Sequence, residues 1–106
     1  MFARIVSLQL KPNARREFMD VLENQIMPAL RKQDGFREEI VSVDPGGPEV
    51  VAMSLWDSKQ AADAYNQTSY PELVKVLAKV IEPNPRVRTL DVAYSTLQKT
   101  AQTVAA

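Results

Sequence analysis

The chain has 106 residues, of which 45% are hydrophobic and 25% charged, and its 13 basic and 13 acidic side chains leave no formal net charge. This length suits one domain with one core, and the charge balance gives no support to binding of nucleic acid or of an anionic membrane. The absence of cysteine excludes disulfides and cysteine metal sites, and the absence of histidine removes the usual neutral-pH base and the commonest metal ligand.

A strand followed by a long helix opens the predicted fold. Residues 2–10 are rich in β-branched and aromatic side chains and end at a Lys-Pro-Asn turn, which is typical of a strand. Residues 14–32 predict a helix, because their apolar residues recur at spacings of three and four. Pro28 removes one backbone hydrogen bond and should kink or break this helix near Met27, and Gly35 should end it in the left-handed conformation.

Two strands joined by a tight turn come next. Residues 36–44 and 49–56 have strand character, and the Pro-Gly-Gly-Pro sequence at 45–48 suits a hairpin turn.

The second of these strands ends in Trp56 and passes directly into a helix from Ser58 to about Asn66. Asp57 and Gln60 stand three apart as in a capping box, or Ser58 caps this helix alone. The joint between strand and helix therefore carries an aromatic side chain, and we expect a ligand pocket to touch it.

The C-terminal part predicts one more helix and one more strand. The Ser-Tyr-Pro-Glu sequence at 69–72 has the form of a second capping box, and it precedes an amphipathic helix. The apolar residues of that helix are Leu73, Val74, Leu77, Val80 and Ile81. The Glu-Pro-Asn-Pro sequence at 82–85 ends it, and residues 86–97 predict the last strand. Residues 1–97 thus form the expected domain, and 98–106 a loose tail or an arm that reaches a neighbouring subunit.

The order strand, helix, strand, strand, helix, strand predicts an α+β fold of the ferredoxin-like βαββαβ type, with helices on one face of a four-stranded antiparallel sheet. Both alternating sets of residues in the strand from Glu49 are apolar: Val51, Met53 and Leu55 on one side, Val50, Ala52 and Trp56 on the other. The helix-free face therefore needs a cover, and a second copy of the chain in a two-fold homodimer is the least demanding one.

The sequence gives little support to a membrane segment or to a bound cofactor. No segment reaches the roughly 18 apolar residues of a membrane span, and Arg4 interrupts the apolar N-terminal stretch, so we expect neither a signal peptide nor a membrane segment and take the cytoplasm as the default location. The acidic residues are scattered without calcium-loop spacing, so we expect no metal ion and no other cofactor.

The chain resembles the small dimeric α/β-barrel proteins of the antibiotic biosynthesis monooxygenase type. The resemblance rests on Asp34-Gly35-Phe36, on the corner Ser54-Leu55-Trp56-Asp57-Ser58, on Ala64-Tyr65 and on Tyr70-Pro71, and it extends to about Leu97. These are signatures of the fold rather than of catalysis. The resemblance implies a ligand pocket within one subunit, between the sheet and the second helical region.

The family includes cofactor-independent oxygenases of aromatic polyketides, quinol oxygenases and haem-degrading enzymes. The haem-degrading branch uses an asparagine on the first strand, a tryptophan in the second helix and a histidine after it. Here the first strand has no asparagine, Tyr65 occupies the tryptophan position and histidine is absent, so haem degradation is not expected.

Three aromatic residues are candidates for ligand binding. Trp56 could stack on an aromatic ligand, or it could be a core residue whose N–H is satisfied at the rim. Tyr65 and Tyr70 could each donate to a substrate oxygen or act as a base, although packing at the pocket edge is the simpler interpretation.

Four polar residues complete the candidate site. Arg4 and Arg88 lie within strands and could grip an oxyanion, or could form ion pairs with Glu38, Glu39 or Asp91. Ser54 and Asn66 could line a cavity, or could satisfy backbone groups.

Two functions remain open at the level of sequence. The first is a cofactor-independent monooxygenase that acts on an aromatic or quinone-like small molecule. The alternative is a dimeric α/β-barrel protein that binds a small molecule, or regulates through it, without turnover. An RNA-binding role is remote, because the aromatic pairs on the central strands and the basic face that it requires are missing.

Overall fold

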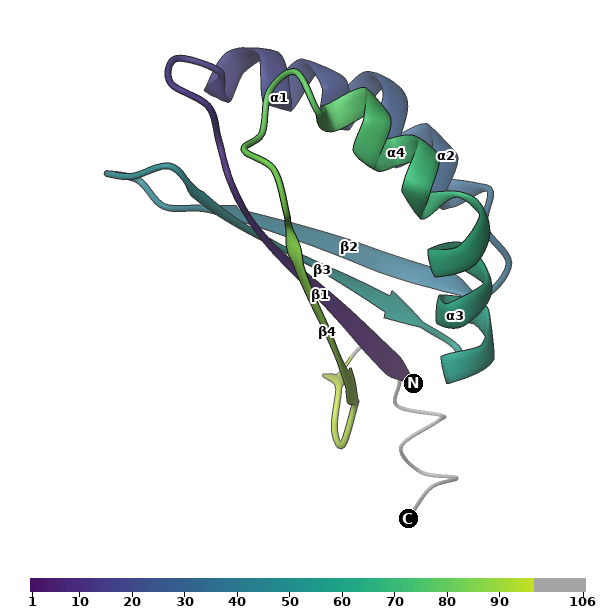
Figure 1. The fold of residues 1–106 in the computed structure, drawn as a ribbon. Helices are drawn as coiled ribbons and strands as arrows, with labels where there is room; N and C mark the ends of the chain where they lie inside the picture. Colours follow the sequence, from purple (N-terminus) through teal and green to yellow (C-terminus); the bar gives the residue numbers. More distant parts are fainter. Residues whose placement is uncertain (97–106) are drawn as a thin grey trace.

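The structure is a computed structural model that describes residues 1–96; Leu97 and the expected arm at 98–106 lie outside the described residues. A four-stranded antiparallel sheet carries helices on one face (Figure 1), which confirms the ferredoxin-like α+β fold. In chain order the elements are β1 (Phe2–Gln9), α1 (Arg15–Val21), η1 (Leu22–Ile26), α2 (Met27–Arg31), β2 (Phe36–Val43), β3 (Glu49–Trp56), α3 (Lys59–Thr68), α4 (Tyr70–Leu77) and β4 (Arg86–Asp91).

The sheet has the strand order β2-β3-β1-β4, and every neighbouring pair is antiparallel. The register places Arg4 opposite Ser54, and Ser54 opposite Glu39. Residues directly opposite one another lie on the same face of a sheet, so these three side chains form a polar row across β1, β3 and β2. Arg4 and Ser54 are buried, which places the row on the side that the helices cover.

The first helical segment is continuous but changes its hydrogen bonding. The five residues of η1 form a π-helix between α1 and α2, and the N–H of Met27 donates to the carbonyl of Leu22, five residues earlier. Pro28 follows immediately and has no N–H to donate. The expected interruption near Met27 is therefore a local change of helix type, and the chain stays helical.

The second helical region confirms one capping expectation and contradicts the other. The Oγ atom of Ser58 accepts a hydrogen bond from the N–H of Ala61 at 3.2 Å, so Ser58 caps α3 alone. The capping box predicted at Ser69 is wrong: this residue is helical and makes no side-chain cap. Its backbone N–H already donates to Tyr65 at 3.1 Å and its carbonyl accepts from Leu73 at 3.1 Å, so α3 runs on into α4 with no free N-terminus to cap.

The last two elements are shorter than the sequence suggests. Helix α4 ends at Leu77, and Val80 and Ile81 are buried in the segment that follows. Strand β4 ends at Asp91, opposite Phe2, so the strand predicted over residues 86–97 is too long. One further backbone hydrogen bond, from the N–H of Val92 to the carbonyl of Met1 at 2.9 Å, lies beyond the last strand pair, and no residue of β1 remains to pair with those that follow.

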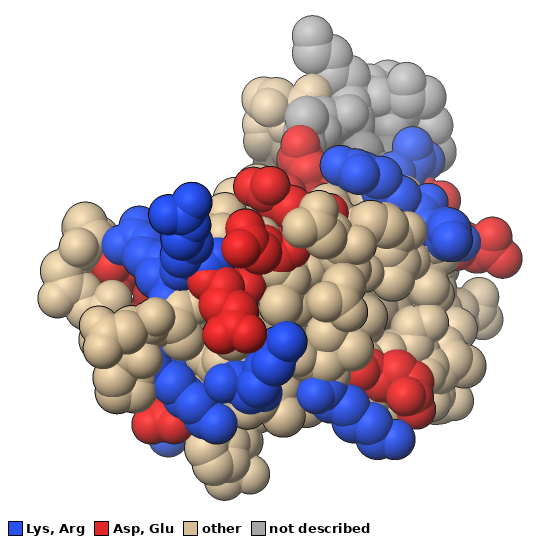
Figure 2. Space-filling model, turned by 90° about the horizontal axis from the view of Figure 1, so that it is seen from above, with Lys and Arg blue, Asp and Glu red and all other residues tan. Residues whose placement is uncertain are grey.

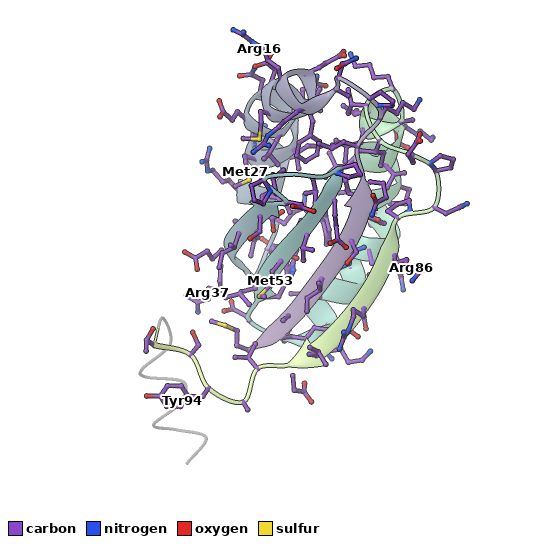
Figure 3. The ribbon with its side chains drawn as sticks, turned by 90° about the vertical axis from the view of Figure 1, so that its left-hand side faces the viewer. Arg16, Met27, Arg37, Met53, Arg86 and Tyr94 are labelled. Carbon is purple, nitrogen blue, oxygen red and sulfur yellow. The ribbon has the colours of Figure 1, made fainter. Side chains whose placement is uncertain are left out.

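The two faces of the molecule differ. Seen from above the helices, basic and acidic side chains are interspersed (Figure 2). The helix-free face carries apolar side chains, among them Met53 (Figure 3), and Ile40 and Leu90 are 47% and 46% exposed there. No helix within residues 1–96 is long and apolar enough to cross a membrane.

Candidate functional site

A cavity of about 60 Å³ lies between the helix-covered face of the sheet and the helices. Hydrocarbon side chains from the first helical segment form much of its wall, including Phe18, Leu22 and Leu30. Its polar lining is the row from the sheet together with two tyrosines of the second helical region: Arg4, Ser54, Glu39, Tyr65 and Tyr70.

Arg4 is the centre of this polar lining. It is 3% exposed, and its Nη2 donates to Oδ1 of Asn66 at 2.7 Å. The guanidinium carbon lies 3.9 Å from the ring centre of Tyr70 and 5.2 Å from that of Tyr65, which are cation–π contacts. A buried, permanently charged group is thus held in place by two aromatic rings and one amide.

Glu39 lies at the other end of the polar row. Its Oε1 atom is buried and has no hydrogen-bond partner in the described structure. Burial raises the pKa of this carboxyl from 4.5 to about 8, although the charge of Arg4 acts in the opposite direction. Desolvation therefore outweighs attraction, and Glu39 is mostly protonated at neutral pH.

Trp56 does not line the cavity itself but contacts two residues that do, Ser54 and Tyr65. It is fully buried, and its Nε1–H donates to Oγ of Ser54 at 2.8 Å. Its ring centre lies 4.9 Å from that of Tyr65, which does line the cavity. Burial raises the pKa of the Tyr65 phenol above its usual range, so this hydroxyl stays protonated.

The structure brings six of the seven candidate residues into one cluster and leaves one outside it. The six are Arg4, Ser54, Trp56, Tyr65, Asn66 and Tyr70. Arg88 lies on β4, opposite Ile5 of β1. Ile5 directly follows Arg4 in β1 and so points to the opposite face, which places the exposed Arg88 on the helix-free face of the sheet. Asn66 is exposed and Tyr70 half-buried, which places both at the rim above Arg4.

Glu39 is not among the site residues expected from the sequence. A usable signal was present, because two consecutive glutamates in a strand must point to opposite faces. One of Glu38 and Glu39 therefore had to lie under the helices. Pairing decides which one: Glu39 is opposite Ser54, whereas Glu38 is opposite Leu55 on the helix-free face.

A larger hollow of about 860 Å³ lies over the start of β4 and the preceding turn at residues 82–85. Arg86, Arg88 and Glu49 on its walls are exposed. A solvated wall weakens charge interactions, so the buried polar row is the better candidate site. Within residues 1–96, no three His, Cys, Asp or Glu side chains gather as metal ligands would.

The sequence model of the antibiotic biosynthesis monooxygenase family matches residues 1–73 of the chain. The chain belongs to this family. Curated proteins give no significant match.

Solved structures agree on the fold. The structure is similar to Rv0793 of Mycobacterium tuberculosis, with 22% identity, a TM-score of 0.70, and coverage of 90% of this chain and 97% of that one. It is also similar to the monooxygenase from the gene ActVA-Orf6 of Streptomyces coelicolor, solved in complex with nanaomycin D, with 19% identity, a TM-score of 0.72, and coverage of 89% and 88%. A protein of unknown function from Nitrosomonas europaea has 14% identity and a TM-score of 0.75, over 90% of this chain and 91% of that one.

Proposed function

We propose that this family member is a cofactor-independent monooxygenase that acts on a small, electron-rich aromatic molecule with an ionisable hydroxyl, such as a phenol or quinol. The observation that carries the proposal is Arg4: a buried guanidinium, flanked by tyrosine rings, that forms part of the wall of an otherwise largely apolar cavity. A permanent cation in a water-poor site stabilises an aryl oxyanion more strongly than water-exposed charges do.

The chemistry requires little of the protein beyond binding, ionisation and exclusion of water. An ionised phenol or quinol passes one electron to O₂, and the substrate radical and superoxide combine to form a carbon–oxygen bond. The peroxide anion that results takes up the proton released when the substrate ionised, and loss of water from this hydroperoxide leaves a carbonyl on the substrate and one oxygen atom in the water. Arg4 would hold the oxyanion, and the hydrocarbon wall would exclude solvent.

The size of the cavity limits the substrate. A dry cavity of about 150 Å³ binds benzene, whereas this one measures about 60 Å³. A one-ring ligand therefore fits only if a side chain moves, and the Tyr70 ring, half-buried at the rim over Arg4, is the natural candidate. Tyr65 lines the cavity and packs on the buried Trp56, so it would stay in place.

We also propose that the functional unit is a homodimer in which the helix-free faces of two sheets pack together. Ile40, Met53 and Leu90 supply apolar surface for this contact. Arg88, which lies on the same face, would then belong to the subunit interface rather than to the cavity of its own chain.

Oxygen consumption tests the proposed activity. The purified protein is incubated aerobically with hydroquinone and with simple phenols, and oxygen uptake and products are followed. Arg4→Gln should abolish uptake, whereas Arg4→Lys, which keeps the charge, should retain part of it. Arg16→Gln removes an exposed arginine of α1 that does not line the cavity, and it is the matched control that should leave the rate unchanged.

The outcome also separates enzyme from binding protein. Uptake that depends on Arg4 supports the monooxygenase. Ligands that bind and are recovered unchanged, with no oxygen uptake by the wild type, would instead support the non-catalytic binding or regulatory role.

A further inference from the structure

The polar row gives the cavity one permanent positive charge and one group that can balance it. Among residues 1–96, Arg4 is the sole cation in the cavity wall and Glu39 the sole acid. The other titratable groups that face Glu39 are Tyr65 of α3 and Tyr70 of α4, while α1, η1 and α2 present hydrocarbon side chains to the cavity. Glu39 is therefore the one carboxylate that can balance the charge of Arg4 in this cavity.

We propose that Glu39 is the group that accepts the hydroxyl proton of a phenolic ligand bound against Arg4. The inference rests on the proposed function for the ligand class, and it names a residue and a step that the proposed function does not supply. In this step the phenol O–H bond breaks, an O–H bond forms on the Glu39 carboxylate, and the electron pair stays on the phenol oxygen. The ligand is then held as a phenolate between guanidinium and neutral carboxylic acid.

Geometry supports the assignment. Glu39 and Arg4 lie two strands apart in one row, separated by the short side chain of Ser54, so a ligand oxygen above Ser54 can approach both. The buried Oε1 of Glu39 has no partner in the described structure and is free to accept or donate a hydrogen bond to such a ligand. An unsatisfied buried carboxylate oxygen is costly for folding alone, and a ligand hydroxyl would satisfy it.

Charge balance favours proton transfer within the site over the binding of a ligand that is already ionised. Before transfer the site holds the Arg4 cation and the Glu39 carboxylate, and after transfer it holds the Arg4 cation and the ligand oxyanion. No net charge enters or leaves the low-dielectric site, so the transfer avoids the desolvation penalty that a phenolate arriving beside an ionised Glu39 would meet.

The acidity of Glu39 is matched to the task. An ordinary phenol such as the tyrosine side chain has a pKa of about 10, roughly 5.5 pH units above that of a solvated glutamate. Burial raises the pKa of Glu39 to about 8, which reduces this gap to roughly two pH units. The Arg4 cation beside the ligand oxygen must close the rest, because a charge in contact with an acid lowers its pKa by about 1–3 units. The carboxylate form that accepts the proton is populated above pH 8, so transfer should become efficient as pH rises through that value.

The test measures the ionisation of a bound ligand and needs no oxygen chemistry. Phenol labelled with ¹³C at the oxygen-bearing carbon is bound anaerobically at pH 9, and the ¹³C shift reports whether the bound ring is neutral or ionised. Calorimetry in two buffers of different ionisation enthalpy counts the protons released per ligand bound. The expected result for the wild type is a bound phenolate with close to no proton released, because Glu39 keeps the proton.

Glu39→Gln should bind neutral phenol, or bind phenolate with one proton released to the buffer for each ligand. Glu38→Gln is the matched control from the same strand, and its side chain points to the other face, so it should behave as the wild type. Thermal unfolding of each variant verifies that it is folded.

Three results would overturn the proposal: neutral phenol bound to the wild type at pH 9, phenolate bound to folded Glu39→Gln without proton release, or no binding of phenol to the wild type at millimolar concentration. A wild type that binds phenolate without proton release but consumes no oxygen would uphold the role of Glu39 while refuting the monooxygenase. Failure of the two proposals is therefore distinguishable.

Discussion

At the scale of single residues, Ser54 connects the core to the cavity. Its hydroxyl accepts from the indole of Trp56 and lies 3.4 Å from the carbonyl oxygen of Arg4, to which it donates. Ser54→Ala would leave a fully buried indole N–H without its acceptor. We expect a loss of about 1–3 kcal/mol in the free energy of unfolding, measured by urea denaturation.

Ser42→Ala provides the comparison for that measurement, because Ser42 is an exposed serine on β2. A substitution of this kind should change the free energy of unfolding by no more than about 0.5 kcal/mol. Equal effects of the two substitutions would show that the bond to Trp56 contributes nothing.

Glu39 makes the stability of the protein depend on pH. The folded protein keeps this carboxyl protonated up to about pH 8, whereas the unfolded chain releases the proton near the ordinary pKa of 4.5. Between these values the folded state binds more protons, so the free energy of unfolding falls as pH rises, by at most about 1.4 kcal/mol per pH unit. Glu39→Gln should remove this component of the slope.

Denaturation of both proteins at pH 5 and at pH 8, at constant ionic strength, measures the effect. The wild type should lose more stability than Glu39→Gln between the two pH values. Parallel pH dependence in the two proteins would mean that Glu39 titrates as an ordinary solvated carboxyl.

At the scale of secondary structure, Gly35 fixes the passage from α2 into β2. It has φ of +80°, and a Cβ added to it would lie 2.6 Å from Cβ of Ala61 in α3. Gly35→Ala therefore combines left-handed strain with a clash against a helix that cannot yield cheaply. We expect it to lower the free energy of unfolding by about 2–4 kcal/mol.

Gly46 offers the matched substitution, since nothing lies within 4 Å of a Cβ placed there. Gly46→Ala should leave the thermal midpoint nearly unchanged, while Gly35→Ala should lower it by several degrees. If the two variants had the same thermal midpoint, α3 would not pack against Gly35 as described.

Local patterns predicted the elements well wherever the outcome depends only on one residue and its near neighbours in the sequence. Gly35 and Ser58 behave as their chemistry suggests, and Pro28 marks the change in helix type. Prediction failed where the outcome depends on a distant partner. Ser69 needs no cap because α3 continues through it, and β4 ends where its register with β1 ends.

In the candidate site, too, the residue types could be predicted from the sequence, whereas their placement depends on distant partners. Residue types alone nominated Arg4, Tyr65 and Tyr70, which the structure assembles. Sequence alone could not separate Glu38 from Glu39, nor place Arg88, because the face that a side chain occupies follows from strand register. A shift of one residue in register would exchange the two glutamates.

At the scale of the whole molecule, the helix-free face should control assembly. Ile40→Lys places a charge on that apolar face, half-way along the edge strand β2, where Ile40 is 47% exposed. In the proposed homodimer this charge would be buried without a partner, so the variant should be monomeric at concentrations where the wild type is dimeric. Light scattering coupled to size-exclusion chromatography measures the mass of each.

Gln67→Lys adds the same charge to an exposed position on α3, on the other side of the molecule, and should leave the mass unchanged. A wild type that elutes as a monomer at micromolar concentration would refute the proposed dimer directly.

The position of the only tryptophan has a practical consequence. Trp56 is fully buried and packs against the ring of Tyr65, which lines the cavity. Emission excited at wavelengths that tryptophan absorbs and tyrosine does not therefore originates from a single fluorophore, one ring away from any occupant of the cavity. Quenching or a wavelength change of that emission gives an unlabelled optical titration, with which compound collections can be screened before the natural substrate is known.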